Sequence, residues 1–271
     1  MSLSLGRISF INVAPLYYAL ENAIVPHPFT FVSAPPSELN IAMREGKLAI
    51  SSCSCVEYAK NWRNYTLARD LCIASSGPVM SVLLFSQKPF EKLQGETIFL
   101  TGQSHTSILL TKLLFKKRFR KDVSFEQANI SAMFDNKSKP VAFLTIGDEA
   151  LRMRKEKDYP YCLDLANAWM EWTKLPFVFA LWIMQKELVS LPKDPSLYLR
   201  KSRDWGLLHI DTVIQDVLGK TPLSKEELLF YYTHALTYSL GEAQQEGLTY
   251  FYALCAEEDL IPEKPKLTFF S

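Results

Sequence analysis

Residues 97–110 constrain the fold more than any other stretch, because a strand, a tight turn and a helix follow one another there without a break. Residues 97–100 are apolar and β-branched, which predicts a short buried strand. The polar segment 101–103 interrupts that pattern. Ser104 is then placed to cap a helix whose apolar face includes Leu109. The stretch is therefore expected to form a corner where the end of a strand meets the start of a helix.

The same corner is a candidate site for a small anion. The first turn of a helix leaves backbone N–H groups unpaired beside the positive end of the helix dipole. The hydroxyls of Ser104, Thr106 and Ser107 add donors at the same place. A small carboxylate is the most natural ligand for such a set. The alternative, that Ser104 does no more than cap the helix, is equally compatible with the spacing.

Strands and helices alternate along the rest of the chain. The expected strands span residues 7–11, 29–32, 49–51, 79–86, 97–100, 141–146 and 177–184. The expected helices include residues 16–21, 38–45 after a Ser37 cap, 164–172, 228–240 after a capping box at Ser224, and 248–254. Such alternation predicts parallel βαβ units and hence an α/β fold.

Polar side chains follow several of the expected strands at the point where each strand ends. Asn12, Ser54, Ser104 and Asp148 hold such positions. In parallel sheets, ligands bind beyond the carboxyl ends of the strands. Neutral hydrogen-bond donors dominate this set, and His and Lys are scarce in it. The sequence therefore predicts a cleft that binds a carboxylated small molecule.

The charge of the chain gives no sign of a nucleic-acid or membrane partner, because its formal net charge is only +1. The basic run at residues 116–121 falls where the helix beginning near Ser104 should end, so it complements the helix dipole. The apolar stretch 175–184 contains a proline and is too short to span a bilayer.

The cysteines and the first residues predict a cytoplasmic protein. The cysteines number five, an odd count with no paired framework, which favours a reducing compartment. Residues 1–7 lack the basic segment and apolar run of a signal peptide.

No metal and no cofactor are expected. The dinucleotide fingerprint, the phosphate loop and the nucleophile elbow are all absent from the sequence. The histidines are scattered without zinc spacing, although His105 lies inside the candidate anion corner. Cys53 and Cys55 have no second Cys/His cluster nearby, so buried thiols at a strand end are favoured over a metal site.

Several segments, in order along the chain, resemble the chorismate dehydratases of the futalosine route to menaquinone. They are GRISFINVAPL at residues 6–16, PPSEL at 35–39, SCVEYA at 54–59, SGPVMSVLLFS at 76–86, LT at 100–101 with SHTS at 104–107, IGDEAL at 146–151, and Trp169 with WTKLPFVFA at 172–180. The likeness weakens after about residue 190. Phe10 stands where family members often have tyrosine, and Cys53 and Cys55 replace more usual small or aliphatic residues.

The resemblance implies a two-lobed type II periplasmic-binding-protein-like fold with a ligand cleft between the lobes. It places the first lobe at residues 1–86 plus 181–271 and the second at residues 87–180. The chain would cross between the lobes near residues 84–88 and 180–186.

The resemblance also implies a reaction, the cofactor-free loss of water from chorismate to give 3-(1-carboxyvinyloxy)benzoate. On that basis Ser104, Thr106 and Ser107 would hold one substrate carboxylate. Asn12 would hydrogen-bond the departing hydroxyl or the other carboxylate. The remaining cradle would consist of Ser54, Ser76 and Ser81.

The sequence leaves three candidates for the group that accepts the ring proton. Asp148 and Glu57 are the candidate protein bases, and the enolpyruvyl carboxylate of chorismate is the alternative. For Asp148, capping its helix competes with a catalytic role.

Two other functions compete with chorismate dehydration. One is that of a dihydroxynaphthoate synthase, a sibling enzyme of the same pathway whose opening motif differs from residues 10–15. The other is binding of a carboxylate in the cytoplasm without catalysis.

Overall fold

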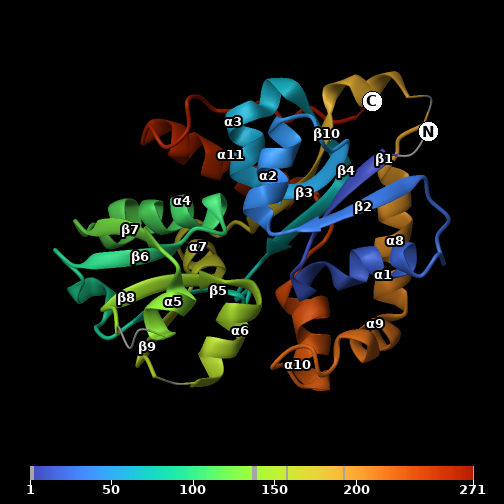
Figure 1. Ribbon diagram of the computed structural model, residues 1–271. Helices are drawn as coiled ribbons and strands as arrows, with labels where there is room; N and C mark the ends of the chain where they lie inside the picture. The colour runs from blue at the N-terminus through green and yellow to red at the C-terminus, as the bar shows by residue number, and fades with distance from the viewer. Residues whose placement is uncertain (1–2, 136–138, 157, 192, 271) are drawn as a thin grey trace.

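The computed structural model describes residues 3–135, 139–156, 158–191 and 193–270. Within these residues, ten strands form two separate sheets with helices packed against them (Figure 1). The first sheet has the order β2 (Phe29–Ala34), β1 (Leu3–Ile8), β3 (Ile50–Ser54), β10 (Phe177–Gln185) and β4 (Tyr65–Ser75). The second has the order β7 (Ser124–Ala128), β6 (Thr97–Thr101), β8 (Ala142–Ile146), β5 (Val82–Ser86) and β9 (Tyr161–Asp164). We call each sheet with its helices a lobe.

The helices divide between the two lobes. The first lobe carries α1 (Ala14–Glu21), α2 (Pro36–Arg44), α3 (Cys55–Asn61), α8 (Ser196–Leu208), α9 (Ile210–Val217), α10 (Lys225–Phe230) and α11 (Glu242–Glu257). The second lobe carries α4 (His105–Leu113), α5 (Ile130–Asp135), α6 (Gly147–Glu156) and α7 (Leu165–Thr173). Short helical turns are η1 (Ile11–Val13), η2 (Trp62–Asn64), η3 (Phe90–Lys92) and η5 (Lys186–Ser190), and π-helical segments are η4 (Leu114–Phe119) and η6 (Tyr231–Ala235).

Both sheets are mixed, so the expected parallel βαβ units make up part of each sheet. Strand β1 pairs in parallel with β2 and β3, and β6 pairs in parallel with β7 and β8. In contrast, β10 is antiparallel to β3 and β4, and β5 is antiparallel to β8 and β9. The reason is that β5 and β10 enter their sheets from the other lobe and not through a crossover helix of their own sheet.

The chain therefore passes between the sheets after β4 and returns with β10. Strand β5 already belongs to the second sheet, and the whole of β10 belongs to the first. The division into residues 1–86 with 181–271 and residues 87–180 stays a prediction, since sheet membership describes strands and not the limits of rigid bodies.

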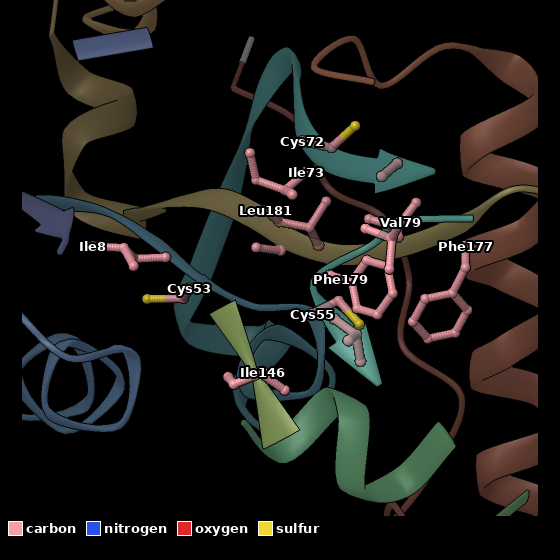
Figure 2. Packing of buried hydrophobic residues seen from close by; sticks show 14 of the residues in the cluster. Ile8, Cys53, Cys55, Cys72, Ile73, Val79, Ile146, Phe177, Phe179 and Leu181 are labelled. Carbon is pink, nitrogen blue, oxygen red and sulfur yellow. The ribbon is translucent and has the colours of Figure 1, made fainter. Parts of the chain in front are cut away.

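One continuous apolar cluster includes residues of both sheets, and Figure 2 shows part of it. Figure 2 shows Leu181 and Phe179 of β10 among neighbours from β3 and β4, with Ile146 of β8 close by. Cys53 and Cys55 are fully buried and unpaired, which confirms that they are thiols at a strand end. The cluster shows that the two lobes share part of their core.

Two expected helix limits are wrong. Helix α2 begins at Pro36, and Ser37 makes no capping hydrogen bond because proline with its fixed φ already occupies the first turn. The expected helix 228–240 ends early, since α10 gives way to η6 and Leu236 is extended. Thr237 instead pairs with Ala74 of β4, so tertiary contacts override the local apolar pattern.

In the part of the chain that is described, we find no helix with the length and apolar character needed to cross a bilayer.

Candidate active site

A cleft with about 590 Å³ of empty space lies between the two sheets. This figure includes space that is open to solvent. Its polar lining consists of Asn12 from η1, Ser54 at the end of β3, Ser81 just before β5, and Ser104 and Ser107 at the start of α4. Both lobes thus contribute polar groups to one cavity, as expected for these five residues.

The remaining walls of the cleft are mostly apolar. They include Ile8, Phe10, Ile73, Val79, Val82, Ile146, Phe179 and Leu236. Figure 2 shows five of these residues converging from β1, β4, β8, β10 and the segment before β5. A site of this kind holds an apolar ring between its walls and fixes the orientation of the ring with a few polar groups.

Two of the cleft serines are helix caps whose oxygens already accept hydrogen bonds. Ser54 Oγ accepts from the backbone N of Glu57 at 3.0 Å, and Ser104 Oγ accepts from the backbone N of Ser107 at 3.2 Å. The capping role expected for Ser104 is therefore confirmed. Because the Ser54 oxygen acts as an acceptor toward the protein, its hydroxyl proton is left to be donated elsewhere.

Ser107 belongs to the same arrangement. Its Oγ lies 2.9 Å from Ser104 Oγ, so one of these two hydroxyls donates to the other and the second keeps its proton. Capping and anion binding are compatible at this corner, because a capped helix still directs its remaining first-turn donors outward. The cleft thus offers donors from both lobes to an anionic ligand.

Asn12 is the polar group in the cleft that most needs a ligand. Its side-chain amide oxygen is buried, and it has no hydrogen-bond partner among the residues that the structure describes. A buried polar atom without a partner costs free energy, so such atoms in native proteins mark a bound ligand, a water or a functional site. The position of Asn12 on the turn η1, directly after β1, matches the expectation that it follows a strand end.

Three predicted site residues lie outside this lining. Ser76 is exposed in the segment after β4. Thr106 is fully buried, and its Oγ1 donates to the backbone oxygen of Phe179 at 3.1 Å. Asp148 follows the lining residue Gly147 but accepts from the backbone N of Ile11 at 3.4 Å, so its carboxylate is directed toward the first lobe.

Neither candidate carboxylate base is free of protein partners. Burial raises the pKa of Asp148, and the Ile11 N–H partly offsets the effect. Burial likewise raises the pKa of Glu57, against the opposing influence of Arg44. Arg44 Nε lies 3.2 Å from Glu57 Oε1, and Asn61 Nδ2 donates to the same oxygen at 2.8 Å.

The described residues that line the cleft include no acid, base, tyrosine or cysteine. His105 stands at the first position of α4 but is not part of the lining. Burial, with the nearby charges of Lys60 and Arg44, lowers the pKa of His105 and so favours the neutral ring. Among the residues described, no three or more His, Cys, Asp or Glu side chains are grouped so as to hold a metal ion.

The sequence did not point to several residues that touch or support the cleft. Leu236 lines it, and Tyr231, Tyr232 and Tyr238 hydrogen-bond the segments that carry Ser81 and Asn12. All four lie in the segment expected to be the apolar face of one long helix. Aromatic residues at helical spacing indicate core packing, so only the fold could reveal their nearness to the cleft.

Solved structures define the class of protein to which this fold and cleft belong. Protein AF1704 of Archaeoglobus fulgidus superposes with a TM-score of 0.77 at 18% identity, covering 96% of this chain and 98% of that one. The CA3427 gene product of Candida albicans, described as having the generic periplasmic-binding-protein fold, superposes with a TM-score of 0.67 at 12% identity, covering 100% and 98%. The chain therefore has the two-lobed type II periplasmic-binding-protein-like fold, with a ligand cleft between the lobes.

Sequence comparison then identifies the family. A family model described as menaquinone biosynthesis matches residues 3–257. The chain is 31% identical over 271 residues to the chorismate dehydratase of Thermus thermophilus, covering 91% of this chain and 93% of that protein. The chain belongs to the menaquinone biosynthesis family, and the resemblance noted in the sequence is confirmed.

Proposed function

We propose that this protein is a chorismate dehydratase, a carbon–oxygen lyase that removes water from chorismate to give 3-(1-carboxyvinyloxy)benzoate without a cofactor. The observation that carries the proposal is the cleft itself, whose polar lining consists of serine hydroxyls and one asparagine amide between apolar walls. The chain belongs to a family that includes chorismate dehydratases, which supports chorismate over other carboxylates as the substrate.

The chemistry of chorismate matches this lining. Chorismate carries a cyclohexadiene ring, a ring carboxylate, an allylic hydroxyl and an enolpyruvyl carboxylate. The apolar walls suit the ring, and the hydroxyl donors of Ser54, of Ser81 and of the Ser104–Ser107 pair suit the carboxylates. Donors from opposite lobes would hold a dianion across the cleft.

The reaction requires no cofactor, because loss of the allylic hydroxyl and the neighbouring ring hydrogen makes the ring aromatic. Removal of the ring proton places negative charge on the ring carboxylate through the conjugated system. Preorganised donors at the start of α4 would stabilise that charge as it develops. The substrate hydroxyl would donate to the side-chain amide oxygen of Asn12, which would give this buried atom a partner.

We assign the proton acceptor to the enolpyruvyl carboxylate of the substrate. The carboxylate takes the ring proton, the C–O bond then breaks, and the departing hydroxide recovers that proton to leave as water. The absence of a titratable side chain among the described lining residues supports this assignment. Asp148, the predicted catalytic acid–base residue, is instead assigned to holding the Ile11 backbone, and Glu57 to pairing with Arg44.

The other two predicted binding residues receive different roles in this proposal. The hydroxyl of Thr106 is committed to the carbonyl of Phe179, so we assign it to fixing the start of α4. Ser76 is exposed and outside the lining, so a substrate contact for it would require movement of its loop.

We also propose that the protein acts in the cytoplasm. All five cysteines are free, and four of them are buried thiols that an oxidising compartment would put at risk of mispairing during folding.

Incubation of the purified protein with chorismate tests the proposal. We expect the aromatic product to appear, detected by its ultraviolet spectrum and by the loss of the mass of one water molecule relative to chorismate. Binding without turnover would favour a carboxylate-binding protein, and turnover only of the nucleoside-derived intermediate of the same pathway would favour the dihydroxynaphthoate synthase alternative. Either result would contradict the proposal.

A further inference from the structure

The segment from η6 to residue 238 lies against the back of the cleft, far along the chain from the polar residues that it contacts. It contains Tyr231, Tyr232 and Tyr238, which are 0%, 1% and 3% exposed. Each phenol donates one hydrogen bond to a group beside the cleft. We call these three residues the tyrosine strut. A π-helical segment of this kind is frequent at functional sites.

Two members of the strut fix the backbone that carries Asn12. Tyr232 Oη donates to the backbone oxygen of Ile11 at 3.0 Å, and Tyr238 Oη donates to the backbone oxygen of Asn12 at 3.0 Å. On the opposite side, the backbone N of Ile11 donates to Asp148. The peptide groups on either side of the Asn12 Cα are thus held directly by tyrosines, whereas the side-chain amide oxygen has no partner among the described residues.

The third member sets the direction of the Ser81 hydroxyl. Tyr231 Oη donates to Ser81 Oγ at 2.8 Å. The only protein acceptor near the Ser81 proton within the described residues is the backbone oxygen of Val79 at 3.4 Å, which is a long contact. Because the phenol fills a lone pair of the Ser81 oxygen, the Ser81 proton is available to a ligand in the cleft.

The strut is itself held rigidly. The backbone N of Cys72 in β4 donates to the oxygen of Tyr238 at 3.0 Å, and Thr237 exchanges two backbone hydrogen bonds with Ala74. Burial raises the pKa of all three tyrosines, so they remain O–H donors at any pH at which the protein would work. Leu236, between them, is part of the cleft lining.

We infer that Tyr231, Tyr232 and Tyr238 are positioning residues that orient the Asn12 amide and the Ser81 hydroxyl toward the substrate. This inference deepens the proposed dehydration, on which its kinetic part rests. Groups that must meet a reacting atom lose about a hundredfold in rate when displaced by about 1 Å, so removal of one phenolic hydroxyl should lower the rate through the group that it positions.

Single Tyr→Phe variants provide the kinetic test. Tyr231→Phe and Tyr238→Phe should each lower kcat for chorismate by about tenfold or more, with a smaller change in KM. Tyr159→Phe is the matched control, because Tyr159 is also buried and its phenol also donates to one carbonyl, that of Pro140 at 3.0 Å, on the far side of the second sheet. Losses within about twofold of those of the control would overturn the inference.

A double-mutant cycle separates positioning from a general disturbance. In a Ser81→Ala background, Tyr231→Phe should change kcat by less than about twofold, because its partner is already gone. An equal loss in both backgrounds would show that Tyr231 does not act through Ser81 and would overturn its assignment.

A second readout is independent of chorismate turnover. The side-chain amide signals of Asn12 in a ¹⁵N–¹H spectrum can be assigned by their loss in Asn12→Ala. They should shift in Tyr238→Phe and remain in place in Tyr159→Phe. If the wild type fails to convert chorismate, the proposed function fails, yet these signals still decide whether Tyr238 orients Asn12, and unchanged signals would overturn that role.

Discussion

Asn12 combines two properties that rarely occur together in a residue that serves only the fold. Its amide oxygen is buried without a partner among the described residues, while its backbone oxygen is held by Tyr238. A buried polar atom in this state lowers the free energy of unfolding and is retained where a ligand completes its hydrogen bonding. The side chain is therefore placed for a partner that the protein itself does not supply.

The first prediction concerns that side chain. Asn12→Ala should lower kcat/KM for chorismate by about 30- to 1,000-fold, which corresponds to about 2–4 kcal/mol for one preorganised hydrogen-bonding group. Its free energy of unfolding should not fall, because no hydrogen bond from a described residue to the amide oxygen is lost. Asn22→Ala, at the exposed end of α1, is the control and should keep wild-type activity. Activity within a few-fold of wild type would remove Asn12 from the mechanism.

Asp148 leads to a prediction about pH. Burial raises the pKa of Asp148 in the folded protein above its value in the unfolded chain, which is about 3.9. The folded state therefore favours the protonated form, and the resulting stabilisation is present below the unfolded pKa and is lost as pH rises through the folded pKa. Asp148→Asn keeps an oxygen for the Ile11 N–H but carries no charge.

Asp148→Asn should consequently unfold at higher urea concentration than the wild type at about pH 7, and the difference should shrink toward about pH 4. The same variant should keep kcat within about threefold of wild type, since general-base catalysis would contribute about 100-fold or more. A loss of that larger size at unchanged stability would identify Asp148 as the proton acceptor.

At the scale of elements, Thr106 joins α4 to the first lobe. Its Oγ1 donates to the Phe179 oxygen of β10 at 3.1 Å and accepts from the backbone N of Val56 in α3 at 3.4 Å. Thr106→Val removes the hydroxyl at nearly constant volume and should lower the free energy of unfolding by about 1–3 kcal/mol. Thr106→Ser keeps the hydroxyl and should cost less. Weaker chorismate binding with unchanged stability would instead indicate a direct carboxylate contact, as the sequence alone suggested.

The elements that the sequence predicts well are those with local signals. The strand at β6 and the Ser104 cap follow from an apolar run, a break and a capping residue within about ten positions. The strand β4 has no such signal, because Arg69 and Asp70 interrupt it and Asp70 adopts a positive φ of 55°. Its pairing with β10, far away along the chain, is what makes it a strand.

The same distinction explains which parts of the site could be predicted. Ser54 and Ser104 are helix caps that follow strands, so their position at the cleft can be predicted from the neighbouring residues in the sequence. Thr106 lies on the same turn as Ser104 and Ser107 but faces the other way, into the contact with Phe179. The spacing of hydroxyl residues does not show which face of the helix each of them occupies. The contacts of the tyrosine strut depend on the tertiary fold, which brings residues 231–238 next to residues from much earlier in the chain.

At the scale of the whole molecule, the site depends on how closely the two lobes approach each other. Phe10 from the first lobe lies against Gly147 from the second, and both line the cleft. Gly147 has a φ of +61°, and a Cβ built on it would stand 3.0 Å from the Phe10 ring. Its backbone N also donates to the oxygen of Ser81 at 2.7 Å. A side chain at this position would therefore push the Phe10 ring, a wall of the cleft, aside by a few tenths of an ångström.

Gly147→Ala tests this dependence, with Gly46→Ala as the matched control. Gly46 has a similar φ of +68°, but a Cβ there would meet nothing within 4 Å. Both variants should lose about 1–2 kcal/mol of stability from the left-handed backbone. Only Gly147→Ala should also lower kcat/KM, by about tenfold or more. If the two variants prove equal in activity, the close contact of Phe10 with Gly147 does not set the geometry of the cleft.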